Sequence, residues 1–272
     1  MKLSIAIATY NEQDTIDRCL TSVEDVADEM VVVDGSSTDR TVSLAKKRRA
    51  RVIITDNPIN FHINKQKAID ASQGNWILQL DADEVVSEKL RNEIHKIIHQ
   101  QPTTNLPRRQ ACNQQLINGY WLPRKNYLLG RWLSKGGQYP DYTMRLYRRG
   151  KGRLPCKSVH EQAEVIGNTG YLVNPLEHYH YPDFTHYLEH FNRYTTILAV
   201  EFKEKDTVVT LANIFNYMIL KPILWFLSTY FRHRGYIDGF AGFVFSFYSA
   251  LRFPCAFVKY WELIKRNNEI KK

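Results

Sequence analysis

Residues 75–84 read NWILQLDADE, a mostly apolar run that ends in three acidic residues. A short apolar run bounded by polar residues is typical of a buried strand. Two earlier runs end in the same way, because LSIAIA at 3–8 is followed by Thr-Tyr-Asn-Glu and MVVVD at 30–34 leads into Asp-Gly-Ser-Ser. Helix-like stretches separate these runs. The alternation predicts an α/β fold with a mostly parallel central sheet flanked by helices.

The same pattern predicts where ligands bind. A further strand is expected at 51–55 and a helix at about 62–72. Because the carboxyl ends of parallel strands border the ligand crevice of an open sheet, we expect the clusters at 9–12, 34–37 and 81–84 to meet there. Two carboxylates one residue apart, Asp81 and Asp83, suit one hard divalent cation that also binds a nucleotide diphosphate.

Composition excludes several protein classes. The chain has 272 residues, of which 44% are hydrophobic and 24% charged, as in an ordinary globular protein. Its four cysteines, at 19, 112, 156 and 255, form no CxxC pair, so neither a disulfide framework nor a cysteine-rich zinc site is expected. No segment reaches about 18 uninterrupted apolar residues, and the first residues do not resemble a signal peptide. We therefore expect a reduced, cytoplasmic compartment.

The excess of positive charge is largest in the middle of the chain. Residues 102–160 carry 12 Lys and Arg and a single acid, Asp141, within a protein of net charge +9. The segment is rich in aromatic and basic residues and predicts loops rather than a regular sheet, forming a substrate-facing surface. A lone carboxylate there is either a general base or the hub of structural salt bridges.

The last seventy residues contain two long apolar runs. IFNYMILKPILWFLSTYF (214–231) and GFAGFVFSFYSALRFPCAFVKYW (239–261) each include a proline and a cation. We interpret them as helices that lie in a membrane interface, with neighbouring Lys and Arg available to anionic head groups. The alternative is that they form a core or an oligomer interface.

Three segments carry a family resemblance. SIAIATYNEQDTIDRCLTSV (4–23), MVVVDGSSTDRT (30–41) and WILQLDADE (76–84) resemble the family 2 inverting glycosyltransferases, which have the glycosyltransferase-A fold. YPDYTMRLYRRGKGRL (139–154), SVHEQ (158–162) and HYHYPDFTHYLEHFNRY (178–194) resemble the branch that contains lipopolysaccharide-core transferases. The GlnxxArgTrp motif of processive relatives is absent, which argues against a polymerising synthase.

The resemblance implies roles for individual residues. It assigns binding of the nucleotide sugar to Thr9, Tyr10, Glu12, Asp34, Lys65 and Asp81. It assigns the metal to Asp81 and Asp83, of which Asp83 is the better candidate for direct coordination, and His160 is a candidate to complete the ligand set. Asp141 matches the general base that takes the proton of the acceptor hydroxyl.

These observations predict three regions and one activity. Residues 1–100 form the nucleotide-sugar half, 101–200 the acceptor half of the same catalytic domain, and 201–272 apolar helices that associate with a membrane. The expected activity is transfer of a hexose or heptose from a nucleotide-diphosphate sugar to a hydroxyl of a cell-envelope glycan or lipid-linked acceptor, with Mg²⁺ or Mn²⁺. The expected location is peripheral, on the cytoplasmic face of an anionic membrane.

Other functions remain open at this level. A polyprenyl-phosphate glycosyltransferase would use the same fold, and a non-catalytic membrane-associated protein that binds glycan or nucleic acid is an alternative from another class. No nucleic-acid motif accompanies the basic segment, so no nucleic-acid partner is expected. A nucleotidyltransferase would need a glycine-rich loop after the first strand, where ATYNEQD has none. The spacing of His178, His180, His186 and His190 argues against a zinc site.

Overall fold

The computed structural model describes residues 2–99, 116–157, 161–181 and 183–270. The chain divides into two compact units. The first comprises residues 1–124 and 141–178, and the second residues 125–140 and 179–272. This division by compactness does not follow the division by expected role at residues 100 and 200, which stays a prediction.

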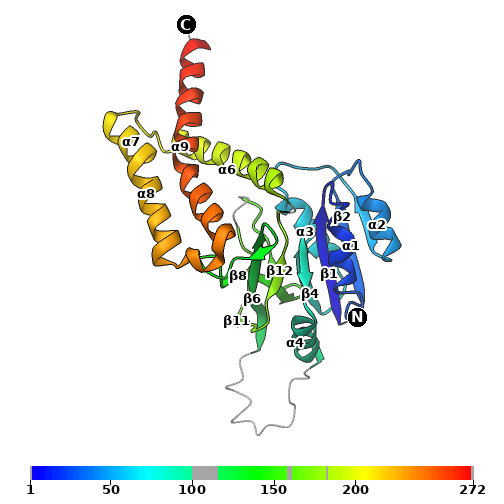
Figure 1. The fold of residues 1–272 in the computed structure, drawn as a ribbon. Coiled ribbons are helices and arrows are strands. Elements are labelled where there is room, and N and C mark those ends of the chain that lie inside the picture. The colour runs from blue at the N-terminus through cyan, green and yellow to red at the C-terminus, as the bar shows by residue number, and fades with distance from the viewer. Residues whose placement is uncertain (1, 100–115, 158–160, 182, 271–272) are drawn as a thin grey trace. The chain divides into compact units, whose positions relative to one another are not determined.

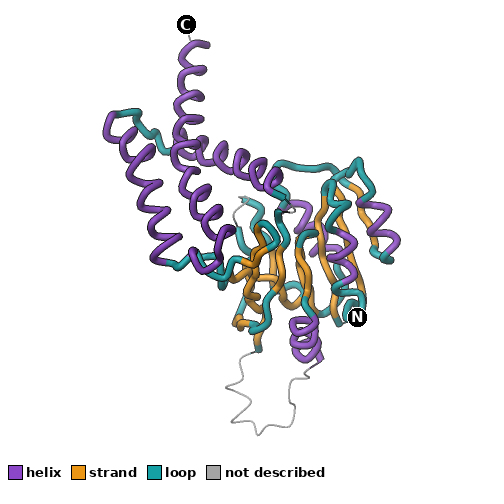
Figure 2. Tube along the Cα trace, in the orientation of Figure 1, coloured by secondary structure: helices purple, strands orange, loops and turns teal. Residues whose placement is uncertain are grey.

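The first unit is built on one long mixed sheet, ordered β3-β2-β1-β4-β8-β6-β12-β5 (Figures 1 and 2). Its parallel part comprises β1 (Leu3–Thr9), β2 (Glu29–Asp34), β3 (Arg51–Ile54) and β4 (Trp76–Asp81). Its antiparallel pairs involve β8 (Asp141–Arg148) with β4 and β6 (Ile117–Leu128), and β12 (Leu176–His178) with β5 (Glu84–Val86). Smaller strands are β11 (Asn168–Tyr171), beside β6, and the pair β9 (Gly152–Arg153) and β10 (Glu164–Val165).

Helices cover both faces of this sheet. Ile5 belongs to a buried cluster with residues of α1 (Ile16–Thr21), α2 (Thr41–Lys47) and α4 (Glu88–His99). Ala6, the next residue of β1, belongs to a second cluster with residues of α3 (His62–Ala71). Successive side chains of a strand point to opposite faces, so residues 5–8 of β1 are all apolar because both of its faces are covered.

The expected strands and helices of the first hundred residues are confirmed to within a few residues. The expectation for 102–160 is wrong where the structure describes that segment, because β6 and β8 are long strands of the main sheet. Aromatic residues such as Tyr120 and Trp121 favour strands. The basic residues Arg124 and Arg145 fit within the sheet because acidic side chains neutralise them. Residues 102–115 and 158–160 lie outside the described residues.

The second unit is mainly helical. It contains the short β7 (Arg131–Trp132), α6 (Phe184–Glu204), a continuous run of α7 (Leu211–Phe215), η1 (Asn216–Leu220), α8 (Lys221–Phe226) and η2 (Leu227–Arg232), then η3 (Gly235–Asp238) and α9 (Gly239–Ile270). The segments 211–232 and 235–266 are long and apolar enough to cross a membrane by length and composition. The helices expected at 214–231 and 239–261 are thus present.

Polar contacts fix the start and the later part of α9 within this unit. The Asp238 carboxylate accepts from the Ser134 hydroxyl and from the backbone N–H of Lys135, both at 2.7 Å. Further along α9, Lys259 Nζ donates to the Thr195 and Thr196 hydroxyls on α6 at 2.8 and 2.9 Å. Asp238 and Lys259 therefore hold α9 against its neighbours. Each hydrogen bond has a charged partner, and such bonds are stronger than those between neutral groups.

Candidate active site

Strand register brings the predicted acidic residues to one edge of the sheet. In β1, Thr9 lies opposite Asp34 of β2, and Ala8 lies opposite Asp81 of β4. The two acids therefore flank the carboxyl end of β1 on either side. This is the meeting of polar clusters that the sequence predicts.

On the β2 side, Asp34 is held by short hydrogen bonds. It is fully buried and accepts from the Thr9 hydroxyl at 2.9 Å, the Ser37 backbone N–H at 2.8 Å and the Ser37 hydroxyl at 2.6 Å. Thr9 thus orients Asp34. Tyr10 is 45% exposed beside them, and Glu12 accepts from the Thr15 hydroxyl at 2.6 Å, which secures the start of α1.

On the β4 side, Asp81 is bound by two cations. Its Oδ1 pairs with Lys65 of α3, and its Oδ2 lies 2.5 Å from Arg145 Nη2 of β8. Burial by itself raises the pKa of Asp81, but the charges of Arg145 and Lys65 outweigh burial and hold that pKa well below its usual range. Asp81 is therefore a carboxylate throughout the neutral range.

The same arginine begins a chain of ion pairs that reaches Asp141. Arg145 Nη2 lies 2.7 Å from Oε1 of Glu84, which is fully buried. Glu84 Oε1 also lies 3.6 Å from Arg124 Nη1, and Arg124 Nη2 lies 2.7 Å from Asp141 Oδ2. Buried charges are tolerated when they are paired and hydrogen-bonded, as they are here.

Asp141, the predicted base, is oriented by these ion pairs and remains accessible from outside the protein. Arg124 donates to its Oδ2 from both Nε and Nη2, at 2.9 and 2.7 Å. Its side chain is 35% exposed, so solvent or an acceptor can approach it. The carboxylate is thus a salt-bridge partner that is also accessible, and its role as general base stays a prediction.

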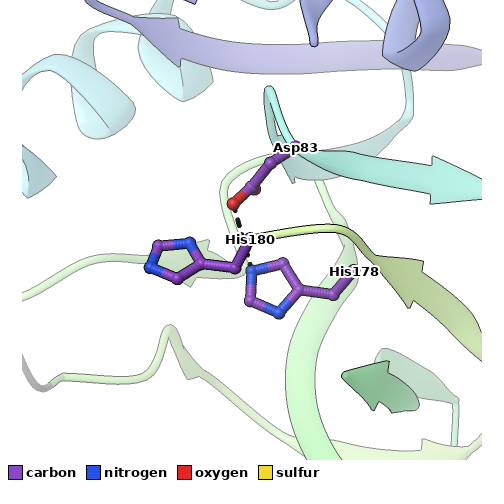
Figure 3. A group of neighbouring side chains, drawn as sticks. All are labelled: Asp83, His178 and His180. Carbon is purple, nitrogen blue, oxygen red and sulfur yellow. Dashed lines mark ion pairs between the residues drawn. The ribbon is translucent and has the colours of Figure 1, made fainter. Parts of the chain in front are cut away.

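A second acid of the DADE motif faces a histidine. Asp83 Oδ2 lies 3.2 Å from His178 Nε2 at the end of β12 (Figure 3). Figure 3 also draws His180, the next histidine along the chain, which belongs to the second unit. A carboxylate oxygen and an imidazole nitrogen at this separation are the donor types that Mn²⁺ and related cations accept. Asp83 and His178 therefore fit a metal.

Asp81 fits a metal less well in this arrangement, because its two oxygens already face Lys65 and Arg145. His160, the third predicted metal residue, lies outside the described residues. Of the other histidines, His186 has its Nδ1 2.9 Å from Asp183 Oδ1 at the start of α6, and His190 has its Nδ1 3.1 Å from the Tyr181 hydroxyl.

One further titratable group lies near Lys65. His62 of α3 is buried, and its Nδ1 lies 4.0 Å from Glu161 Oε2. Burial, assisted by the charge of Lys65, lowers the pKa of His62. The imidazole is therefore neutral at pH 7.

Sequence reasoning did not assign roles to Glu84, Arg124 or Arg145, and it interpreted the spacing around His178 as evidence against a zinc site. The spacing of Asp141 and Arg145 contained a usable signal, because residues four apart on a strand lie on one face. No local pattern indicates that Arg145 reaches Asp81 and Glu84, because those contacts span more than sixty residues of sequence.

Comparison with known proteins is consistent with this site. A family model described as Glycosyl transferase family 2 matches residues 4–152. The lipopolysaccharide core biosynthesis glycosyltransferase LpsC of Rhizobium meliloti (strain 1021) is 28% identical over 269 residues, which cover 93% of this chain and 92% of LpsC. An uncharacterized glycosyltransferase of Rickettsia typhi, RT0209, is 29% identical over 246 residues, 89% of this chain and 81% of that protein.

A solved structure, S. aureus TarS 1-349 in complex with UDP, is 19% identical with a TM-score of 0.45 and covers 87% of this chain and 74% of its own. The family match spans more than half of this chain and includes β2, β4 and β8, the strands on which Asp34, Asp81 and Asp141 lie. This chain belongs to glycosyl transferase family 2, and it is a glycosyltransferase with the glycosyltransferase-A fold.

Proposed function

We propose that this protein is a metal-dependent inverting glycosyltransferase that transfers a sugar from a nucleotide diphosphate to a hydroxyl of a cell-envelope glycan or lipid-linked acceptor. The observation that carries the proposal is the chain of ion pairs from Asp81 to Asp141. It holds a donor-side acid and an accessible carboxylate in fixed positions on neighbouring strands. Fixed positions for both reactants are what a direct displacement requires.

Donor binding is assigned to the carboxyl ends of β1, β2 and β4. Asp34 presents a buried, oriented carboxylate that suits the N–H of a nucleobase. Lys65 lies beside Asp81 and supplies positive charge for phosphate oxygens. Asp83 and His178 would hold the divalent cation, which supplies charge neutralisation for the departing diphosphate.

Asp141 carries out the proton transfer. The acceptor oxygen bonds to the anomeric carbon while the bond from that carbon to the diphosphate oxygen breaks, and the hydroxyl proton passes to Asp141. A single displacement inverts the anomeric centre and needs no enzyme nucleophile. Arg124 acts as a positioning residue because its two hydrogen bonds fix the Asp141 carboxylate.

The acceptor class follows from the relative and from the chain's own charge. LpsC is named for lipopolysaccharide core biosynthesis and aligns with almost all of this chain. The cationic residues of 102–160 suit an acceptor that carries anionic groups. We place the enzyme peripherally on the cytoplasmic face of the membrane, where nucleotide sugars and lipid-linked acceptors meet.

The test is a calorimetric and thermal-shift panel of UDP, GDP, ADP and CMP, each with and without Mn²⁺ or Mg²⁺. Wild type is compared with Asp83→Asn and with a matched control, Asp25→Asn, whose side chain is 79% exposed. We expect one diphosphate to stabilise wild type and Asp25→Asn only with metal, and Asp83→Asn to lose this response. Equal stabilisation of all three proteins without metal would contradict metal dependence, and no binding by any of them would contradict the transferase assignment.

A further inference from the structure

The helical segment 211–232 of the second unit has an unusual surface. None of its most apolar 18-residue window is buried inside the protein. Between 211 and 231, all of which the structure describes, every exposed residue is apolar. These residues are Leu211, Ala212, Ile214, Phe215, Met218, Ile219, Leu220, Ile223, Leu224, Trp225, Leu227 and Phe231.

The polar residues between 211 and 231 are all buried or half-buried. They are Asn213, Asn216, Lys221, Ser228 and Thr229. A helix on the surface of a water-soluble protein has the opposite arrangement, with its polar face outward. The inverted pattern indicates that the surroundings of this segment are apolar.

Contacts with α9 explain how the inward-facing groups are satisfied. The Lys221 ammonium lies 4.0 Å from the centre of the Tyr217 ring, and that ring stacks on Phe257 of α9 at 5.1 Å. Trp225 Nε1 lies 3.2 Å from the Ser249 hydroxyl of α9. The pairing of 211–232 with α9 thus satisfies the Trp225 Nε1 and packs the Tyr217 ring that lies beside Lys221.

The exposed apolar residues are not confined to one side. Met218, Ile219 and Leu220 are exposed in succession, and so are Ile223, Leu224 and Trp225. At the 3.6 residues per turn of an α-helix, the three residues 223–225 of α8 occupy more than half of the helix circumference. A folded protein partner covers one side of a helix, whereas lipid chains surround it. Lipid therefore fits this surface better than a second copy of the chain.

Charged residues lie at both ends of the apolar region. Arg232, His233 and Arg234 are exposed in the turn that joins the two helices, and Lys265 and Arg266 are exposed near the end of α9. Between these ends, α9 exposes the stripe Phe240, Phe243 and Phe247. Cations at the borders of an apolar surface suit the head groups of an anionic bilayer.

Other contacts argue against a helix pair that crosses the membrane. Asp238 ties the start of α9 to the 134–135 backbone, and Lys259 ties its later part to α6. The exposed side of α6 carries Glu189, Arg193 and Lys203. A crossing α9 would draw these charges into the hydrocarbon, which is costly.

We propose that 211–232 and the first half of α9 insert sideways into one leaflet of an anionic bilayer, with the axis of 211–232 roughly in the membrane plane and its polar side covered by α9. Helices of this kind reach about 5–10 Å into the boundary of head groups and acyl chains. The proposal goes beyond peripheral attachment because it names the inserted surface. It needs neither donor nor acceptor, so it can fail while the transferase assignment stands.

The first test is flotation of the full chain with vesicles of phosphatidylglycerol and phosphatidylethanolamine, followed by a wash in molar salt. Ile219→Asp combined with Leu224→Asp removes two exposed side chains of the inserted surface. Ile59→Asp combined with Val173→Asp is the matched control, because both are highly exposed apolar residues of the first unit. We expect the first pair to lower the bound fraction at least tenfold and the control to leave it unchanged.

Quenching of fluorescence by brominated lipid gives an independent readout of depth. The signal of Trp225 is taken as the difference between wild type and Trp225→Phe, and we expect quenching of that difference signal. Trypsin added outside sealed vesicles should cleave at both Arg234 and Lys265, because an in-plane pair leaves both ends on one side.

Three results would overturn the proposal. Release of wild type by molar salt means a purely electrostatic contact, and protection of one tryptic end means a membrane crossing. A detergent-free dimer that does not float, and that the Ile219/Leu224 pair dissociates, means that a second copy covers the surface. Circular dichroism of each variant ensures that loss of binding is not loss of folding.

Discussion

Arg124 and Asp141 lie opposite each other on the antiparallel strands β6 and β8, and both hydrogen bonds between them end on the same carboxylate oxygen, Oδ2. The guanidinium therefore fixes the carboxylate through one oxygen. Arg124 is in turn paired with Glu84, which is buried beneath it. The position of the proposed base thus depends on a fully buried charge, that of Glu84.

Asp141→Asn should abolish transfer without affecting donor binding. The amide keeps the size of the side chain but does not accept the acceptor's proton at neutral pH, so kcat should fall by about 100-fold or more. The affinity for the metal and nucleotide diphosphate, measured by calorimetry, should remain within twofold of wild type. Unchanged kcat in the variant would rule out Asp141 as the base and leave it as a salt-bridge partner only.

Glu84→Gln should reduce both stability and activity. Glu84 is fully buried, pairs with Arg145 and Arg124, and accepts from the backbone N–H of Asp81 at 2.9 Å. The neutral amide leaves the buried Arg145 and the half-buried Arg124 short of negative charge, so the free energy of unfolding should fall by about 2–3 kcal/mol. Urea denaturation measures this loss.

The matched control is Glu164→Gln, because Glu164 pairs with Arg153 in an exposed ion pair. Surface pairs of this kind contribute about 0–1 kcal/mol. A loss of equal size in the two variants would mean that burial of Glu84 does not strengthen its contribution.

The depressed pKa of Asp81 makes stability depend on pH in a defined direction. Arg145 and Lys65 favour its carboxylate form in the folded chain despite burial. Its contribution is therefore present above the ordinary carboxyl pKa of about 4 and is lost as the pH falls below that value. Asp81→Asn should destabilise the protein most near neutrality, and the difference from wild type should shrink in acid.

Denaturation at pH 7 and at about pH 3 measures that difference. Asp25→Asn serves as the control, because Asp25 is largely exposed and pairs with Arg91 at the surface. A difference between wild type and Asp81→Asn that stays constant across this range would show that Asp81 does not supply pH-dependent stability.

The sequence reveals the fold more completely than it reveals the site. The apolar runs that become β1, β2 and β4 are continuous in sequence, and their polar ends meet because parallel strands place them at one edge. The sequence analysis does not predict β6 and β8, because the cationic residues in these strands favour an exposed loop over a buried strand. Only the folded chain supplies Glu84, Asp81 and Asp141 as their partners.

The proposed metal site, too, is only partly predictable from the sequence. Asp83 is indicated by its motif, whereas His178 comes from the far end of the sheet, where β12 pairs with β5. The antiparallel register sets His178 opposite Glu84, next to Asp83 in the chain. A single histidine in the sequence carries no such information, so spacing alone does not distinguish His178 from His160.

Single alanine variants of these two histidines separate the candidates. His178→Ala should weaken metal-dependent binding of the nucleotide diphosphate by about 10-fold or more, because it removes the imidazole 3.2 Å from Asp83. Calorimetry with Mn²⁺ measures the loss, and His186→Ala, an exposed histidine paired with Asp183, is the control. If His160→Ala loses the response and His178→Ala keeps it, the assignment of His178 is wrong, and the ion pair with Asp83 then serves only to join β12 to the loop after β4.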